Sequence, residues 1–306
     1  MHRRLPWFIQ CVLVVAGLAL CAPAPAWQAP PASVPPAADT FQLVLPPDAG
    51  PADSAVSLQF IGTATVLIRY QGLVVLTEPN FLHKGEKVYL GYGQHATRLT
   101  EPALTLEQLP PIDLVILSHM HEDHFDRRVQ AQLRRDVPIV TTREASEHLE
   151  RLGFTRRYAL ARWDTLEVRK GATLLRVSAM PARHGGPVTS ALLPPVMGSM
   201  LDFRHGATGP PYRLYISGDT LVFDDIADIP RRFPDVDLAL LHLGGTRVFG
   251  MLKVTMDGDD GVRMMRIIAP AQAIPIHFDD YEVFKSPLAD FERAVKGASL
   301  SARWSI

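Results

Sequence analysis

The sequence of 306 residues contains only two cysteines, Cys11 and Cys21, and both lie close to its amino terminus. If the first 26 residues are removed as an export signal, the remaining chain has no cysteine. It can then form no disulfide and offer no thiolate to a metal, even in an oxidising compartment. A metal site in the folded part would have to use imidazole and carboxylate ligands instead.

An excess of positive charge is also missing. The chain has 31 basic and 32 acidic residues, a formal net charge of −1, and no long basic run. Loss of Arg3 and Arg4 with the leader would take the charge from −1 to −3. A mildly acidic chain without a basic strip is a poor match for a polyanion. We therefore expect no nucleic-acid partner.

No apolar run is long enough to cross a bilayer comfortably. The run 7–20 has about 14 residues, whereas a spanning helix needs about 20. It follows a basic start and precedes alternating small residues, so 1–26 is predicted to be a signal peptide cleaved at Ala24 or Ala26. The protein would then be periplasmic or secreted. The alternatives are lipidation at Cys21 and an uncleaved leader that anchors the protein at a membrane.

The rest of the chain divides into a linker and one domain. Residues 27–53 are rich in Pro and Ala and are expected to be an extended linker. Residues 54–306 have the apolar content of a globular domain, and their patterns predict strands and helices. The expected strands are 56–62, 65–70, 73–77, 112–117, 138–141, 166–169, 173–179, 212–217, 238–242 and 273–276. The expected helices are 126–135, 144–152, 224–232, 257–268 and 287–295.

The most informative stretch is 112–125, IDLVILSHMHEDHF. Its apolar half is typical of a strand buried on both faces. Four metal-ligand side chains follow directly, at His119, His121, Asp123 and His124. A helix could not direct all four to one side, because positions i and i+2 lie on different faces. A tight loop after the strand could.

The hexapeptide HMHEDH resembles the H-x-H-x-D-H motif of the metallo-β-lactamase superfamily of metal-dependent hydrolases. The opening stretch FIGTATVLIRYQGLVVLTEPNF and the later SGDT are similar to segments of the same superfamily. The resemblance implies a four-layer αβ/βα sandwich, in which two mixed β-sheets are flanked by helices.

The resemblance also implies two metal sites. His119, His121 and His184 resemble the ligands of the first, and Asp123, His124 and His277 those of the second. Asp219 resembles a carboxylate that bridges both metals. Imidazole and carboxylate ligands suit two divalent ions, with Zn²⁺ expected first and Mn²⁺ or Fe²⁺ as alternatives.

Three further residues have two readings each. Glu78 stands in Thr-Glu-Pro where relatives usually have Thr-Asp-Pro, and it either orients a metal-bound histidine or is a strand-end turn residue. His242 ends a predicted strand and either contacts substrate or packs behind the site. Lys285 follows His277 and either meets an anionic group of the substrate or lies in a solvated loop.

The implied activity is hydrolysis of a small ester, lactone or phosphodiester by a hydroxide that bridges the two metals, with Asp123 and Asp219 as catalytic residues. The GTATVLI and SGDT contexts resemble the branch that includes ascorbate-6-phosphate lactonases and N-acyl-phosphatidylethanolamine phospholipase D. A lipid substrate would bring the protein close to a membrane. The alternatives are a catalytically idle metal-binding or lipid-binding protein on the same fold, and a nuclease of the superfamily.

Overall fold

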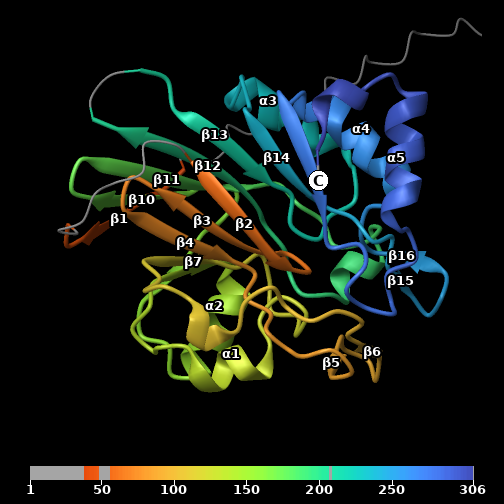
Figure 1. Ribbon diagram of the computed structural model, residues 1–306, viewed down its shortest axis with the longest axis horizontal. Helices are drawn as coiled ribbons and strands as arrows, with labels where there is room; N and C mark the ends of the chain where they lie inside the picture. The colour runs from red at the N-terminus through yellow and green to blue at the C-terminus, as the bar shows by residue number, and fades with distance from the viewer. Residues whose placement is uncertain (1–37, 48–55, 207–208, 306) are drawn as a thin grey trace, which may run out of the picture. The chain divides into compact units, whose positions relative to one another are not determined.

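The computed structural model describes residues 38–47, 56–206 and 209–305, which build two β-sheets packed face to face (Figure 1). The predicted signal peptide lies outside the described residues. Residues 38–306 form one unit by their contacts. Among the described residues, no helix is both long and apolar enough to cross a membrane.

The six-stranded sheet contains the amino-terminal strands. An antiparallel meander, β2-β3-β4, continues into three parallel strands, β7-β8-β9. The strands are β2 (Ser57–Gly62), β3 (Thr65–Tyr70), β4 (Leu73–Thr77), β7 (Leu114–Ile116), β8 (Ile139–Thr141) and β9 (Arg157–Ala159).

The seven-stranded sheet has the order β1-β10-β11-β12-β13-β14-β17. Strands β10 to β13 are antiparallel neighbours, while β1 pairs parallel with β10, and β13, β14 and β17 run parallel. The strands are β1 (Thr40–Leu45), β10 (Thr165–Lys170), β11 (Thr173–Met180), β12 (Gly198–His205), β13 (Tyr212–Ile216), β14 (Leu238–His242) and β17 (Gln272–Ile276). Two small hairpins lie outside both sheets: β5 (Lys87–Tyr89) with β6 (His95–Thr97), and β15 (Arg247–Val248) with β16 (Leu252–Lys253).

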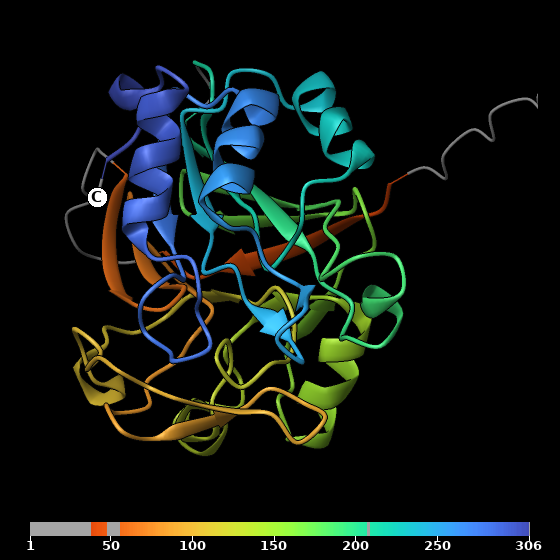
Figure 2. The same ribbon diagram turned by 90° about the vertical axis from the view of Figure 1, so that its right-hand side faces the viewer.

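Helices cover the outer face of each sheet, which gives the four expected layers. α1 (Arg127–Gln132) and α2 (Arg143–Arg151) bury Val129 and Leu149 against the six-stranded sheet. The seven-stranded sheet is covered by α3 (Asp228–Arg232), α4 (Gly258–Ile268) and α5 (Leu288–Gly297), as Figure 2 shows from the side.

The continuous apolar runs of the central strands follow from this layering. In β7, Leu114 and Ile116 face the core between the sheets, while Val115 packs under the helices. In β14, Leu240 likewise faces the inner core and Leu241 the outer one. Because side chains alternate along a strand, burial of both faces requires an apolar residue at every position.

Several expectations about the strands need correction, because β9 and the strands of both small hairpins were not predicted. The linker was expected to run to residue 53, but β1 lies within it and pairs with β10 from Thr40↔Thr165 to Leu45↔Lys170. The folded domain therefore begins before residue 54, because these six residues find hydrogen-bond partners that are distant in the sequence. No strand was predicted between 187 and 211, yet β12 lies there, in the middle of its sheet.

The side chain of Asp126 joins α1 to the loop after β4. It is fully buried, and it accepts hydrogen bonds from the backbone N–H groups of Phe81, Leu82, Arg128 and Val129. It therefore caps the helix amino terminus and fixes the neighbouring loop at the same time.

We predict that Asp126→Ala lowers the free energy of unfolding by roughly 2–4 kcal/mol, because the helix loses its cap and buried N–H groups lose their acceptor. Thr142→Ala is the matched control, since Thr142 caps α2 by accepting a single bond from Ala145 N. It should cost only about 1 kcal/mol. Urea denaturation measures both values, and equal losses would contradict the double role of Asp126.

Candidate metal centre

The site is built where strands of both sheets end. Six polar side chains or motifs follow the carboxyl ends of six strands: Glu78 after β4, the 118–125 loop after β7, His184 after β11, Asp219 after β13, His242 at the end of β14 and His277 after β17. In the six-stranded sheet, β4 and β7 are parallel. In the seven-stranded sheet, β13, β14 and β17 are parallel, and β11 runs in their direction because β12, between β11 and β13, is antiparallel to both. All six strands therefore end at the same edge. Carboxyl ends of strands at one edge are where ligand sites form in α/β sheets.

The backbone turns sharply at several of these strand ends. Glu78 and His277 adopt φ angles of 41° and 63°, which side-chain-bearing residues seldom do. Gly218 has a φ of 61°, and a Cβ there would lie 2.6 Å from the carbonyl oxygen of Met197. Glycine is therefore required in front of Asp219. Such strain is concentrated at functional sites, where the surrounding structure imposes it.

Three imidazoles form the first group. The ring nitrogens His119 Nε2 and His121 Nδ1 are 3.0 Å apart, and His184 Nε2 is 3.3 Å from His121 Nδ1. The far nitrogen of His184 is 3.0 Å from the carbonyl oxygen of Val254, which only accepts hydrogen bonds. His184 Nδ1 therefore carries the proton, and its Nε2 lone pair points into the group.

Two carboxylates and two imidazoles form the second group. His124 Nε2 lies 3.3 Å from Asp219 Oδ2, and His277 Nε2 lies 3.4 Å from Asp123 Oδ2. Asp219 also approaches the first group, with its Oδ2 3.9 Å from His184 Nε2. Its carboxylate is therefore placed between the two groups.

The polar atoms left without a partner test whether a cation fits here. Asp123 Oδ1, Asp219 Oδ1, His124 Nε2 and His277 Nε2 are all buried and have no hydrogen-bond partner among the described residues. Buried polar atoms rarely lack partners, because the loss of hydration is costly. Here one such atom comes from each member of the second group, so this donor set fits a divalent ion of the kind held by histidine and carboxylate.

The two groups differ in the direction in which the pKa values of their histidines are shifted. Burial lowers the pKa of His121 to about 4, with His184 adding to the shift, and it also lowers the pKa of His184. Burial and the neighbouring His124 hold the pKa of His119 well below its usual range. These three rings are therefore neutral at pH 7 and are ready to donate lone pairs.

The second group is charged. Burial acts to lower the pKa of His124, but Asp219 and Asp123 outweigh it and raise that pKa well above its usual range. The pKa of His277 is raised in the same sense, mainly by Asp219 against burial. Burial likewise acts to raise the pKa of Asp219, but His277 and His124 hold it well below its usual range. The two imidazoles and the two carboxylates of this group thus favour one another's charged forms.

A cavity opens directly above both groups. His121, Asp123, His184 and Asp219 form its floor. Its walls are mainly apolar, and Arg247 is the one Lys or Arg side chain among the described residues that line it. The wall residues include Leu90, Tyr92, Leu193, Val248, Val254 and Val283.

Comparison with known proteins agrees with this geometry. The family model described as "Beta-lactamase superfamily domain" matches residues 89–278. The chain belongs to this family. Residues 89–278 contain every member of both groups, from His119 to His277.

Relatives and solved structures agree with the assignment. A metal-dependent hydrolase of Nanoarchaeum equitans is 25% identical over 70% of this chain and 93% of its own. One of Thermoplasma acidophilum is 29% identical over 61% and 73%. The fold matches that of a possible metal-dependent hydrolase from Veillonella parvula, with a TM-score of 0.68, 20% identity and coverage of 82% and 97%. It also matches isothiocyanate hydrolase from Delia radicum gut bacteria, with a TM-score of 0.67, 21% identity and coverage of 81% and 94%.

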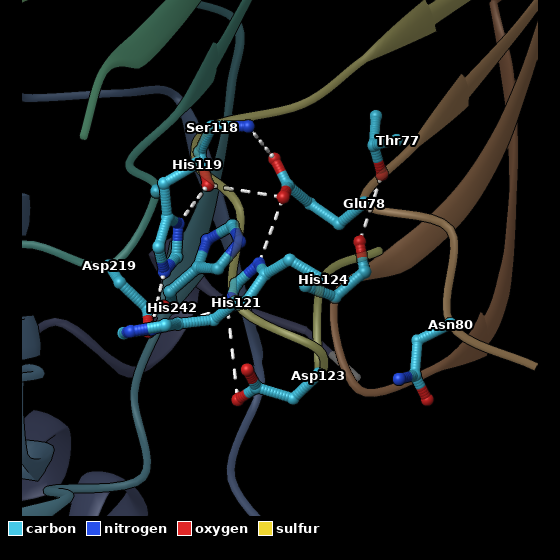
Figure 3. A network of polar contacts seen from close by, with 12 residues as sticks. Thr77, Glu78, Asn80, Ser118, His119, His121, Asp123, His124, Asp219 and His242 are labelled. Atoms are coloured by element: carbon cyan, nitrogen blue, oxygen red, sulfur yellow. Dashed lines mark hydrogen bonds and ion pairs between the residues drawn. The ribbon is translucent and has the colours of Figure 1, made fainter. Parts of the chain in front are cut away.

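The contacts of Glu78 bear on both of its readings. Its carboxylate is buried and lies 2.8 Å from His124 Nδ1, so it reaches the ring behind the second group (Figure 3). It also accepts hydrogen bonds from the backbone N–H and the hydroxyl of Ser118. Burial raises the pKa of Glu78, although His124 opposes the shift. Glu78 thus forms the turn after β4 with its backbone, and its side chain contacts the ring of His124.

Sequence reasoning did not single out Ser118. Its Oγ lies 2.9 Å from His119 Nδ1 and 3.1 Å from Glu78 Oε2, so it links one histidine of each group to the same carboxylate. The signal was a hydroxyl residue at the end of an apolar run, immediately before the motif.

His242 and Lys285 lie elsewhere. His242 is fully buried, stacks on His124 with 5.9 Å between ring centroids, and does not line the cavity. Lys285 faces a separate polar hollow that also contains Asp257 and Asp290, and its ammonium group donates to the carbonyl of Glu282. The structure therefore does not bring Lys285 to the site.

We predict that Glu78→Gln weakens metal binding at the second group about 10- to 100-fold, because the neutral amide orients His124 less well and makes its ring less basic. Competition with a coloured chelator measures the affinity. Glu122→Gln is the matched control: Glu122 lies in the same loop as His124, but its carboxylate binds Arg127 and Tyr89 N and no histidine. Equal affinities for wild type and Glu78→Gln would refute an orienting role.

Proposed function

We propose that this protein is a metal-dependent hydrolase that cleaves a small ester, lactone or phosphodiester. The observation that supports this most directly is the floor of the cavity, where one member or more of each ligand group is open to an incoming molecule. The names of its relatives agree, since they are called metal-dependent hydrolases.

We further propose that His119, His121 and His184 hold one divalent ion and Asp123, His124 and His277 a second, with Asp219 shared. Zn²⁺ is expected first, with Mn²⁺ or Fe²⁺ as alternatives. Such ions supply a Lewis acid and a water molecule that is nucleophilic near neutral pH.

The chain's own residues contribute position and charge. Asp123 and Asp219 present carboxylate oxygens to the cavity, where they can accept a proton of the attacking water and align it. The apolar walls exclude bulk water and thereby strengthen these contacts. Glu78 and Ser118 fix the rings of His124 and His119 from behind.

The walls also bear on substrate choice. Beyond the charge of the proposed metal ions, the walls offer a phosphodiester little, because Arg247 is the one Lys or Arg among the described lining residues. Among the three proposed substrate types, an uncharged ester or lactone therefore fits these walls best. The same scarcity of cations disfavours a nuclease.

His121→Ala and Asp219→Ala should each lower kcat/KM by more than about 100-fold, because loss of a direct ligand exceeds the effect of an outer partner. The assay is hydrolysis of p-nitrophenyl acetate with metal content measured on the same samples. His83→Ala and Asp136→Ala are matched controls, since both side chains are well exposed and lie outside both groups. Full activity in either site variant would overturn the assignment, while metal binding without any hydrolysis would favour an idle metal-binding protein.

A substrate panel tests the choice of bond. We expect a higher kcat/KM for a γ-lactone and for p-nitrophenyl acetate than for bis-p-nitrophenyl phosphate, because the walls add only Arg247 to the charge of the proposed metal ions. Arg247→Gln should widen this difference, since it removes the charge that the walls add. A clear preference for the phosphodiester would refute this reading of the walls.

A further inference from the structure

Three segments form the mouth of the cavity: 87–95, 186–196 and 246–253. Each contributes lining residues, for example Tyr92, Leu193 and Val248. The hydroxyl of Tyr92 donates to the carbonyl of Leu192, which joins the first segment to the second. We call these three segments the mouth rim. Figures 1 and 2 place its two hairpins, β5–β6 and β15–β16, on the same side of the domain.

The mouth rim exposes an unusual amount of apolar surface. In 186–196, Val188 is 79% exposed, and Leu192 is also well exposed. The β15–β16 hairpin exposes Phe249, Met251 and Leu252, with Met251 at 74%. In 87–95, the exposed aromatic residues are Tyr89 and Tyr92.

The concentration is not what chance would give. Of the eleven exposed large hydrophobic residues in the described chain, seven lie on the mouth rim. The rim makes up roughly a tenth of that chain. Scattered exposed hydrophobic residues are ordinary, but contiguous ones mark an interaction surface.

The charge of the mouth rim is equally one-sided. The three segments contain no Asp or Glu, although the whole chain has 32 acidic residues among 306. The carboxylate of Glu122 does reach Tyr89 N of the first segment, but it is paired with Arg127. They do contain Lys87, Arg247 and Lys253. Lys253 pairs with Asp257 and Asp260 outside the rim, whereas Lys87 and Arg247 are exposed. Apolar tips beside exposed cations, with tyrosines among them, match the interface of a bilayer that contains anionic lipids.

We propose that the mouth rim docks on an anionic lipid bilayer, so that the cavity opens toward the membrane surface. Phe249 and Met251 enter the boundary between headgroups and acyl chains, while Lys87 and Arg247 face the phosphates. A substrate with an apolar tail then passes from the lipid layer to the cavity without crossing bulk water. The docking does not depend on catalysis, whereas this last step rests on the proposed hydrolase function.

Tryptophan quenching tests the docking in the full chain. Phe249→Trp places a reporter at the tip of the hairpin, and Val44→Trp places the same reporter on β1, where Val44 is 73% exposed but far from the rim in sequence and outside it. With phosphatidylglycerol vesicles brominated on the acyl chains, emission from the Phe249→Trp variant should fall markedly, and emission from the Val44→Trp variant should not. The leader is common to both variants, so it cannot produce the difference. Equal quenching, or none in either, would overturn the proposal.

A second pair of variants measures the strength of docking. Phe249→Ser/Met251→Ser should weaken vesicle binding of the rim about tenfold or more, because two apolar side chains are lost from the interface. Leu252→Trp is added as the quenching reporter to each of the two double variants compared here. Phe41→Ser/Val44→Ser, which alters two exposed residues of β1, should leave the quenching curve unchanged. Replacing phosphatidylglycerol by phosphatidylcholine should weaken binding of the wild type.

Two other results have defined meanings. If the rim double variant changes the molecular mass measured by sedimentation equilibrium without vesicles, the rim binds a second copy and the proposal is wrong. Hydrolysis of water-soluble p-nitrophenyl acetate should be unchanged in both double variants, because none of the four residues lines the cavity. Docking without any hydrolysis would refute the proposed function and leave the docking surface standing.

Discussion

The face-to-face packing of two sheets is the constraint on which the site depends. The inner core holds β3, β4 and β7 against β10 to β14 and β17, so the carboxyl ends of strands from both sheets meet at one edge. Six polar positions follow those ends, although they come from segments up to 199 residues apart, from Glu78 to His277. Backbone strain at several of these ends is the local cost of turning each chain so that its side chain points inward. The layers that provide stability thus also determine which residues can share a ligand.

The charges of the site residues explain why the pKa of each depends on its neighbours. Asp123 and Asp219 are buried beside His124 and His277, and neither pair would be stable there alone. The raised pKa values favour protons on the rings, which balance the carboxylates, but four buried polar atoms still lack a partner among the described residues. A divalent ion would replace those protons and satisfy those atoms together. The three neutral histidines of the other group need no such exchange, so the two halves of the centre differ in chemistry although they lie side by side.

The sequence predicted those parts of this arrangement that depend on residues close together in the chain. The apolar run before His119 indicated a strand buried on both faces, and the density of ligands after it indicated a loop. His184, Asp219 and His277 each stand alone in the sequence, and only the resemblance to a known motif order connected them. The role of Glu78 stayed open because it depends on whether one extra methylene still reaches His124, which is a matter of distance rather than pattern. The strands β1 and β12 were not predicted because each depends on a partner strand rather than on its own sequence pattern. β1 is six residues long within a Pro- and Ala-rich region, and its partner is 125 positions away at the Thr40↔Thr165 pair, while β12 carries Asp202, which Arg213 of the adjacent strand neutralises.

Both the cavity and the mouth rim are apolar, and the exclusion of water from the site accounts for the cavity. Strong contacts between the floor carboxylates and an incoming molecule need a dry site, and dryness is provided by apolar walls. The walls are made by short loops. A short loop that directs some apolar side chains into the cavity cannot bury its remaining apolar side chains as well. In water, exposed residues such as Val188 and Met251 lower solubility and gain nothing. Against a lipid surface the same residues are buried, and the absence of acidic residues from the rim removes the repulsion that anionic headgroups would otherwise exert. In the proposed docking, the apolar cavity and its apolar rim act together: they take a poorly soluble molecule out of the membrane and present it to the proposed metal centre.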